Sequence, residues 1–265
     1  MIFYFSGNGN TRHAALELGR QLDLAVHELS PAELLHPDTV TLHTNEPIVI
    51  WAFPTYSWGV PPVVARLMKH VHLDDTMTAA THIMLTTCGD DMGYTDRQWR
   101  RIMHRRGLKT GGAYAVIMPN TYTLMKGFDV DSPALAKEKL KASASRIEAI
   151  VADIRRTAEH LDGSTPAYTD MPVRLGWSWA KSGIVYPWFV RFAMSPRPFH
   201  SNEGCISCCK CARECPMANI EMIDGRPQWG KHCALCLRCY HACPRHAVAY
   251  STATSGKGQY LCPLK

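Results

Sequence analysis

The sequence predicts a doubly wound α/β domain with a five-stranded parallel sheet, followed by a small α+β domain rich in cysteine. Two observations predict this fold class. Short apolar runs alternate with longer amphipathic stretches through residues 1–163, as expected for a parallel sheet covered by helices on both faces. Ten of the eleven cysteines then fall between Cys205 and Cys262. Hydrophobic residues make up 46% of the 265 residues, which supports real cores and excludes general disorder.

Five apolar runs predict the strands of the sheet, and amphipathic stretches between them predict the helices. The expected strands are residues 1–5, 24–29, 47–53, 82–87 and 112–118. The expected helices are residues 11–22, 61–70, 96–105 and 133–161, the last with a recurring apolar face that includes Leu161. Five strands in about 160 residues fit a doubly wound domain, in which ligands bind at the carboxyl ends of the strands.

The composition of the chain then changes at residue 164 and again at residue 204. Residues 164–203 contain several prolines and many aromatic residues, so we expect a strap that packs over one domain or between the two. A contact with a membrane surface or a second copy of the chain is the alternative. Residues 204–251 form the cysteine-rich domain, and residues 252–265 form a C-terminal tail.

An internal repeat organises the cysteine-rich domain. The pattern C-x2-C-x2-C-x3-C-P occurs twice, and the second copy follows 28 residues after the first. The first copy ends at Pro216 and the second at Pro244. The cysteines of the first copy are Cys205, Cys208, Cys211 and Cys215, and those of the second are Cys233, Cys236, Cys239 and Cys243.

This region resembles the bacterial ferredoxins that carry two [4Fe-4S] clusters, over about 48 residues. In these proteins the fourth cysteine of each run ligates the other cluster. The resemblance implies one cluster held by Cys205, Cys208, Cys211 and Cys243, and a second held by Cys233, Cys236, Cys239 and Cys215. Structural zinc sites are the alternative, but they more often use two C-x2-C pairs. We expect Cys88 and Cys262 to be unligated, and Cys209 to be either a spare thiol or a swapped ligand.

A short polar loop follows the first expected strand and leads into a helix. Small residues allow backbone N–H groups to converge on a phosphate, and the helix N-terminus favours an anion there. The loop lacks the lysine of a nucleotide-triphosphatase loop and does not have G-x-G-x-x-G spacing. The residues of this loop are Ser6, Gly7, Asn8, Gly9, Asn10 and Thr11.

The loop resembles the phosphate loop of flavodoxins, which holds the phosphate of FMN, with Asn8 in place of the usual middle threonine. Two further loops match, and Tyr56 or Trp58 is the expected aromatic partner of the flavin ring. Cys88 stands where flavodoxins often carry an aromatic residue, so we expect one flavin face to be more open. The loop after the third strand contributes Pro54, Thr55, Tyr56, Ser57, Trp58 and Gly59, and the loop after the fourth contributes Thr87, Cys88 and Gly89.

Taken together, the two halves resemble the flavodoxin–ferredoxin fusion proteins found mainly in anaerobes. The resemblance implies a flavodoxin-like first domain, FMN, two [4Fe-4S] clusters, a cytoplasmic location and redox activity. We expect an electron-transfer protein that relays electrons between clusters and FMN, with a ferredoxin-type donor or an acceptor enzyme as partner. One alternative is an FMN-dependent reductase of a small organic acceptor such as a quinone or an enone, and another is a redox sensor or assembly partner.

The remaining features exclude other classes of function. No run of 18 residues is apolar and uncharged throughout, so no transmembrane segment is expected, and residues 1–5 lack the pattern of a signal peptide. The formal net charge of +6 is largely offset by about −4 from two oxidised clusters and about −2 from the FMN phosphate. The basic stretch at residues 97–109 is expected to be a solvated face, and docking of an acidic electron carrier is the alternative. Nucleic-acid binding is not expected, because no recognised nucleic-acid-binding module accompanies the stretch.

Overall fold

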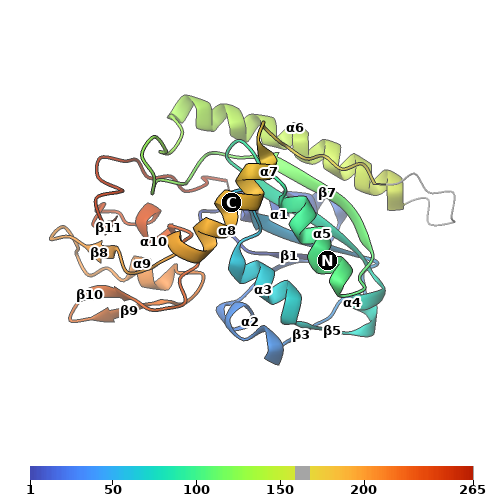
Figure 1. Ribbon diagram of the computed structural model, residues 1–265, viewed down its shortest axis with the longest axis horizontal. Coiled ribbons are helices and arrows are strands. Elements are labelled where there is room, and N and C mark those ends of the chain that lie inside the picture. The colour runs from blue at the N-terminus through green and yellow to red at the C-terminus, as the bar shows by residue number, and fades with distance from the viewer. Residues whose placement is uncertain (159–167, 265) are drawn as a thin grey trace.

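The computed structural model of the chain describes residues 1–158 and 168–264. Its centre is a five-stranded parallel sheet in the order β2-β1-β4-β6-β7, as Figure 1 shows. This is the 2-1-3-4-5 order of flavodoxin-like folds, in which the switch point lies beside the first strand. The predicted α/β fold is therefore confirmed for the first part of the chain. The strands are β1 (Ile2–Tyr4), β2 (Val26–Glu28), β4 (Ile48–Pro54), β6 (Thr81–Cys88) and β7 (Thr110–Ile117).

Successive side chains of each strand enter two different cores. Phe3 and Phe5 pack into one core with Trp51, whereas Ile2 and Tyr4 pack into the other. Both faces of the sheet are apolar because helices cover both. Helices α1 (Asn10–Leu22) and α6 (Pro133–Ala158) cover one face, and α3 (Pro62–His70) and α5 (Thr95–Arg105) cover the other.

The expected element boundaries are correct to within about two residues where the structure describes them. The fifth strand begins at Thr110 rather than residue 112, and the first helix begins at Asn10 rather than residue 11. Leu161, the expected end of α6, and the expected domain boundary at residue 163 lie outside the described residues.

Several short elements were not predicted, because two to five residues are too few to show a period. Among them, helix α2 (Pro31–Leu35) begins with a capping box, in which the side chains of Ser30 and Glu33 each accept a hydrogen bond from the other's backbone amide. These elements are α2 (Pro31–Leu35), η1 (Pro37–Thr39), β3 (Thr41–Leu42), β5 (His72–Leu73) and α4 (Asp75–Ala79).

The aromatic segment contains a helical run that crosses in front of the sheet in Figure 1. The run spans residues 178–193 and alternates between α-helical and π-helical hydrogen bonding. Its inner side packs on the loop after β4, where Tyr186 Oη donates to the carbonyl oxygen of Val60 at 2.6 Å. The pieces are α7 (Ser178–Ala180), η2 (Lys181–Val185), α8 (Tyr186–Trp188) and η3 (Phe189–Ala193).

The cysteine-rich region has two antiparallel strand pairs and two short helices, at the left of Figure 1. One pair joins β8 to β11, and the other joins β9 to β10. The elements are β8 (Phe199–Ser201), α9 (Lys210–Arg213), β9 (Ile220–Ile223), β10 (Arg226–Trp229), α10 (Arg238–His241) and β11 (Val248–Tyr250).

The backbone repeats the sequence repeat. Helix α10 lies 28 residues after α9, and both helices begin after a residue with positive φ, Cys209 at 59° and Leu237 at 62°. Ser207 and Leu235 also have positive φ, at 54° and 53°. Cys209 therefore occupies the backbone position of Leu237, which is not a ligand position in the second copy.

Candidate functional site

The loop after β1 presents an uncapped helix N-terminus at the switch point of the sheet. Gly9, the N-cap of α1, has a φ of 95°, and no side chain caps this helix end and no acidic residue lies in its first turn. The first backbone N–H groups of a helix have no intrahelical acceptor, so they favour an anion. The hydroxyl of Ser6 accepts a hydrogen bond from the Gly9 amide at 3.2 Å, which fixes the loop.

The loop after β6 is joined to this first loop by buried hydroxyl groups. Thr11 Oγ1 and Thr87 Oγ1 are 2.7 Å apart. The neighbouring Cys88 is buried, and this burial, followed by the charges of Asp91 and Asp90, raises the pKa of its thiol to about 12. Cys88 is therefore a neutral thiol in this site.

The loop after β4 makes a two-residue turn. Ser57 and Trp58 have φ values of 45° and 62°, and Tyr56 and Gly59 exchange two backbone hydrogen bonds of 2.9 and 3.0 Å. Two central residues with positive φ are typical of a type I′ turn. A Cβ atom at Gly59 would lie only 2.3 Å from the ring of Tyr186, so the close approach of the helical run requires glycine here.

The three loops enclose a cavity of about 120 Å³. Gly9 and Gly59 lie outside its wall, and Trp58 lines a neighbouring cavity instead. The predicted residues that line it are Ser6, Gly7, Asn8, Asn10, Thr11, Pro54, Thr55, Tyr56, Ser57, Thr87, Cys88 and Gly89. Pro119, Asn120, Thr121 and Tyr122, from the loop after β7, complete this side.

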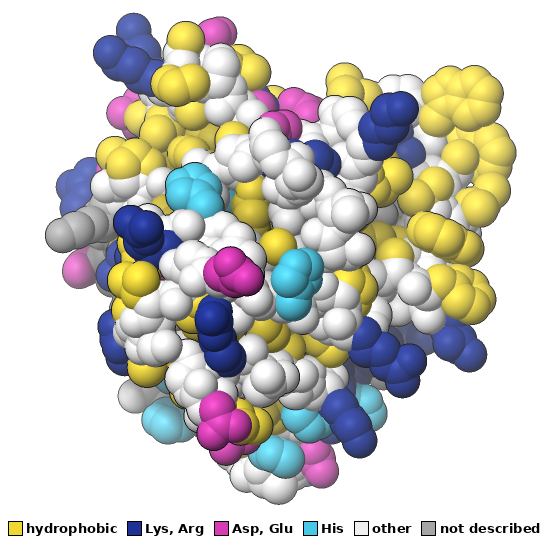
Figure 2. Space-filling view, turned by 90° about the vertical axis from the view of Figure 1, so that its left-hand side faces the viewer, with side chains coloured by type: hydrophobic (Ala, Val, Ile, Leu, Met, Phe, Trp, Pro, Cys, Tyr) yellow, Lys and Arg dark blue, Asp and Glu magenta, His cyan; other side chains and the backbone are white. Residues whose placement is uncertain are grey.

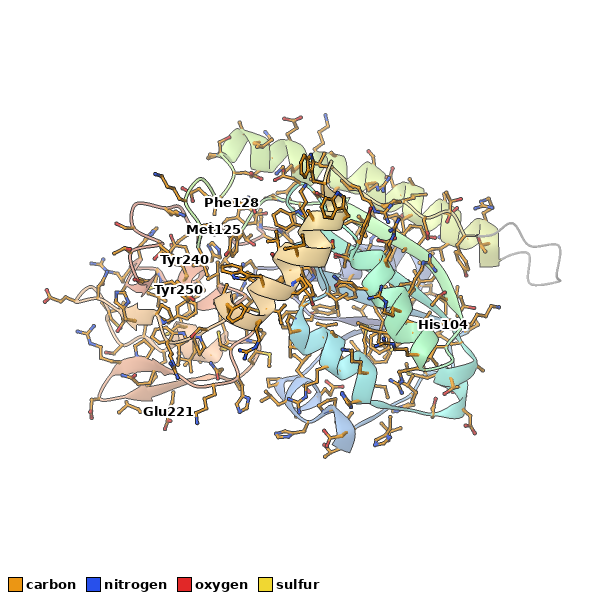
Figure 3. The ribbon with its side chains drawn as sticks, viewed as in Figure 1. His104, Met125, Phe128, Glu221, Tyr240 and Tyr250 are labelled. Atoms are coloured by element: carbon orange, nitrogen blue, oxygen red, sulfur yellow. The ribbon has the colours of Figure 1, made fainter. Side chains whose placement is uncertain are left out.

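A larger cavity of about 530 Å³ adjoins the first. The two share wall residues, among them Thr55, Cys88 and Asn120. Its volume falls in the range of small-molecule pockets, and most of its other walls are apolar. These walls include Trp58, Tyr122, Met125, Phe128, Leu175, Val185, Trp188 and Phe189. Figure 3 labels Met125 and Phe128 in the loop between β7 and α6.

One ion pair lines the larger cavity. Lys181 Nζ lies 2.6 Å from Asp91 Oδ2, and the same ammonium group lies 5.4 Å from the centre of the Trp58 ring. Sequence reasoning missed Lys181, Val185, Trp188 and Phe189 as site residues. The only signal was the aromatic composition of residues 164–203, which gives no information about the loops that it covers.

The structure brings the eight repeated cysteines together in two groups. Burial raises the pKa of Cys211, and the nearby thiols of Cys243 and Cys205 raise it further. Burial likewise raises the pKa of Cys239 well above its usual value, and Cys236, Cys233 and Cys215 add to this. A small cavity in the first group is lined by Cys205, Cys208, Cys211 and Cys243, and Cys209 lines it as well. The assignment of these sulfur atoms to two clusters stays a prediction.

Hydrogen-bond donors point at several of these sulfur atoms. The Sγ atoms of Cys215, Cys233 and Cys243 accept backbone N–H bonds of 3.4, 3.3 and 3.2 Å. The indole N–H of Trp229 donates to Cys239 Sγ at 3.5 Å. Such donors stabilise thiolates and tune an iron–sulfur cluster, so this donor set fits [4Fe-4S] clusters. In the described residues no three His, Cys, Asp or Glu side chains are arranged around a single metal ion. A four-iron cluster does not require such an arrangement, because its cysteines bind different irons.

The second cysteine group forms part of the wall of the smaller cavity. Leu235, Cys236 and Leu237 line it, and Cys236 lies directly against the first loop. A Cβ atom at Gly7 would lie 2.9 Å from the Cβ of Cys236. Tyr56 lines the same cavity, and its pKa is raised well above the usual value by burial and then by Cys236 and Cys233.

Residues of the C-terminal tail also reach the first loop, which the sequence did not predict. The amide of Cys262 donates to the carbonyl oxygen of Asn8 at 2.8 Å. The hydroxyl of Tyr260 donates to Asn10 Oδ1 at 3.4 Å. The tail therefore helps to hold the first loop in place.

Comparisons with known proteins give only distant similarity. The sequence matches no family model and no curated protein. The Trp repressor binding protein of Bacillus subtilis is similar over 56% of this chain and 96% of its own length, at 15% identity and a TM-score of 0.38. The flavodoxin of Megasphaera elsdenii is similar over 56% of this chain and 97% of its own, at 15% identity and a TM-score of 0.33. An azoreductase of Bacillus anthracis is similar over 57% of this chain and 97% of its own, at 10% identity and a TM-score of 0.35. Scores this low carry no argument, so the fold assignment rests on the strand order.

Proposed function

We propose that this chain is an iron–sulfur flavoprotein that relays electrons between two [4Fe-4S] clusters and FMN, and on to a redox protein partner. One observation carries the proposal most directly: the segment Leu235–Leu237, which contains the predicted ligand Cys236, forms a wall of the cavity beneath the uncapped N-terminus of α1. A cluster ligand and a flavin site that share a wall suit electron exchange between the two groups.

Residues of the three loops would hold FMN. The backbone amides that follow Gly9 would bind its phosphate, with the hydroxyls of Ser6 and Thr11 nearby. The apolar walls of the larger cavity, including Trp58, would accept its ring system. When bound, the clusters would carry single electrons, and FMN would exchange one or two.

The two cysteine groups differ in exposure, and this gives the relay a direction. Cys208 of the first group is exposed, whereas Cys239 of the second group is buried and Cys236 lines the cavity. Each group has one buried cysteine, Cys211 or Cys239, and Cys208 is the exposed member of the eight. We therefore place the docking site of a ferredoxin-type donor or an acceptor enzyme at the first group.

The test is anaerobic rapid mixing of the cofactor-loaded chain with a reduced ferredoxin. The iron–sulfur absorption of the wild type should bleach first, followed by the flavin absorption. Cys236→Ser should slow or abolish flavin bleaching, whereas Cys209→Ser, which alters a thiol that bonds the carbonyl oxygen of Ser207, should not. Equal flavin bleaching in wild type and Cys236→Ser would overturn the proposed route.

A second candidate function is an FMN-dependent reductase of a small organic acceptor of the quinone or enone type. The cavity of about 530 Å³ favours it, because a carrier that only passes electrons to other proteins needs no enclosed apolar space. Steady-state oxidation of the reduced chain by quinones and, separately, by ferredoxins distinguishes the two functions. Fast oxidation by ferredoxins alone argues against the reductase.

A further inference from the structure

The helical run at residues 178–193 and the residues just before it bury two serines and expose most of their large apolar side chains, with Phe189 as a buried exception. Ser178 and Ser182 are each only 7% exposed. By contrast, Trp177 is 75%, Trp188 is 57% and Phe192 is 66% exposed. An ordinary surface helix buries its apolar face and exposes its polar one. We call the exposed residues Leu175, Trp177, Trp179, Ile184, Val185, Trp188 and Phe192 the aromatic face.

Hydrogen bonds on the inner side hold the run in this orientation. Ser182 Oγ donates to the carbonyl oxygen of Trp58 at 2.8 Å and accepts the amide of Tyr94 at 2.7 Å. Tyr186 Oη donates to the carbonyl oxygen of Val60. Rotation of the run to bury its aromatic rings would break these bonds and leave buried polar groups without partners.

The outer side chains form one apolar surface rather than scattered contacts. The Trp177 and Trp179 rings stack with centroids 6.5 Å apart, and the Trp188 and Phe192 rings are 6.3 Å apart. Figure 2 shows hydrophobic side chains gathered at its right-hand edge, with Lys and Arg side chains below them. Large exposed apolar patches mark interaction sites.

The charged side chains of the segment at residues 171–202 are all basic. Residues 171–202 contain no Asp or Glu, but they include Arg174, Lys181, Arg191 and Arg197. Arg174 and Lys181 form ion pairs with Asp96 and Asp91. Arg191 and Arg197 are exposed, and the Arg191 guanidinium lies 5.3 Å from the centre of the Phe192 ring.

We propose that the aromatic face docks this protein on the surface of an anionic phospholipid bilayer. Tryptophan side chains favour the depth of the headgroups, and exposed arginines pair with lipid phosphates. Within the described residues no helix is long and apolar enough to cross a membrane, so the run lies in the plane of the interface. A symmetric contact through this face would bring the arginines of both copies into an interface to which residues 171–202 contribute no acidic partner, which opposes self-association.

The docked orientation also places the larger cavity beside the lipid. Val185 and Trp188 belong both to the aromatic face and to the wall of this cavity. Met125, on another wall, is exposed as well. An apolar molecule dissolved in the bilayer would therefore meet the cavity without crossing bulk water.

Vesicle flotation of the anaerobically purified, cofactor-loaded chain tests the proposal. Wild type should float with vesicles of equal parts phosphatidylglycerol and phosphatidylcholine, and should bind pure phosphatidylcholine less strongly. Trp177→Ser combined with Trp188→Ser should weaken binding by about tenfold or more, because it removes two interfacial anchors. Arg191→Glu combined with Arg197→Glu should weaken it by at least about fivefold at low salt.

Matched controls separate docking from general effects. Ile223→Ser removes an exposed apolar side chain of β9, and Arg101→Glu reverses an exposed charge of α5, so both should leave flotation unchanged. Iron and flavin content, measured on the same samples, reports the cofactors independently of lipid binding. Failure of wild type to float would overturn the proposal, as would equal flotation of the Trp177→Ser/Trp188→Ser variant. A dimer in light scattering that this variant converts to monomer, with no vesicle binding, would assign the face to a second copy instead.

Discussion

The side-chain amide of Asn8 donates a 3.0 Å hydrogen bond to the carbonyl oxygen of Cys236. This bond joins the loop after β1 to the second cysteine group across 228 residues of sequence. It fixes the distance between the expected phosphate site and a predicted cluster ligand. Both halves of the chain therefore contribute to one site, and a change on either side of this bond should affect the other.

Asn8→Ala should lower the free energy of unfolding by about 1–2 kcal/mol, because it leaves the Cys236 carbonyl oxygen without its donor. Asn8→Asp should cost more, since it places a carboxylate against that oxygen. Anaerobic urea denaturation of the cofactor-loaded chain measures both. Two variants as stable as wild type would show that the bond does not join the two halves.

Gly9→Ala should destabilise the chain more than Gly107→Ala does. Both glycines have positive φ, at 95° and 70°, so each alanine incurs a similar backbone cost of about 1–2 kcal/mol. A Cβ at Gly9 also lies 3.0 Å from the Cβ of Cys262, whereas nothing lies within 4 Å of one at Gly107. Gly9→Ala should in addition weaken FMN binding, measured by flavin titration, and Gly107→Ala should not. Equal effects of the two substitutions would exclude a special role for the Gly9 contact.

Val185→Trp should obstruct the larger cavity, because Val185 lines it from the helical run. If the chain reduces a small organic acceptor, this variant should raise KM for a quinone by roughly tenfold, measured on the FMN-loaded fraction because the same cavity would accept the FMN ring. The neighbouring Ile184 is exposed and lies outside the wall of this cavity, so Ile184→Trp is the matched control. Unchanged KM in Val185→Trp would show that the acceptor binds elsewhere.

His82 should make the stability of the chain fall at acid pH. Burial lowers its pKa to about 4, while its Nδ1 accepts the Trp51 indole N–H at 3.0 Å. Because the folded pKa lies below the ordinary value of 6.5, the unfolded chain binds the proton more readily. The contribution of neutral His82 to the free energy of unfolding is complete above pH 6.5 and is lost as pH falls towards about 4. The total loss in the free energy of unfolding is up to about 3 kcal/mol.

The pH dependence of unfolding in His82→Phe tests this assignment. The variant should lose part of the slope between pH 6.5 and 4, whereas His104→Gln, which alters an exposed side chain of α5, should keep it. Figure 3 shows His104 on the outer side of the molecule. The same slope in His82→Phe and wild type would assign the acid sensitivity to other groups.

The sheet and the cysteine repeat could be predicted because their signals are local. Most of β4 is buried, so the strand reads as one apolar run, and α9 and α10 repeat at the spacing of their cysteines. The walls of the site could not all be predicted, because Val185 and Cys236 reach it only through tertiary packing. Apolar periodicity would predict the wrong buried side for the helical run, since Ser182 faces the protein and Trp188 faces outward.

The most direct test of the account is the iron and flavin content of the chain after anaerobic purification and FMN titration. Two predicted cluster sites and one predicted phosphate loop imply about eight irons and one FMN per chain, with the visible spectrum of [4Fe-4S] clusters and flavin. Bound zinc in place of iron, or a chain that takes up no FMN, would contradict it.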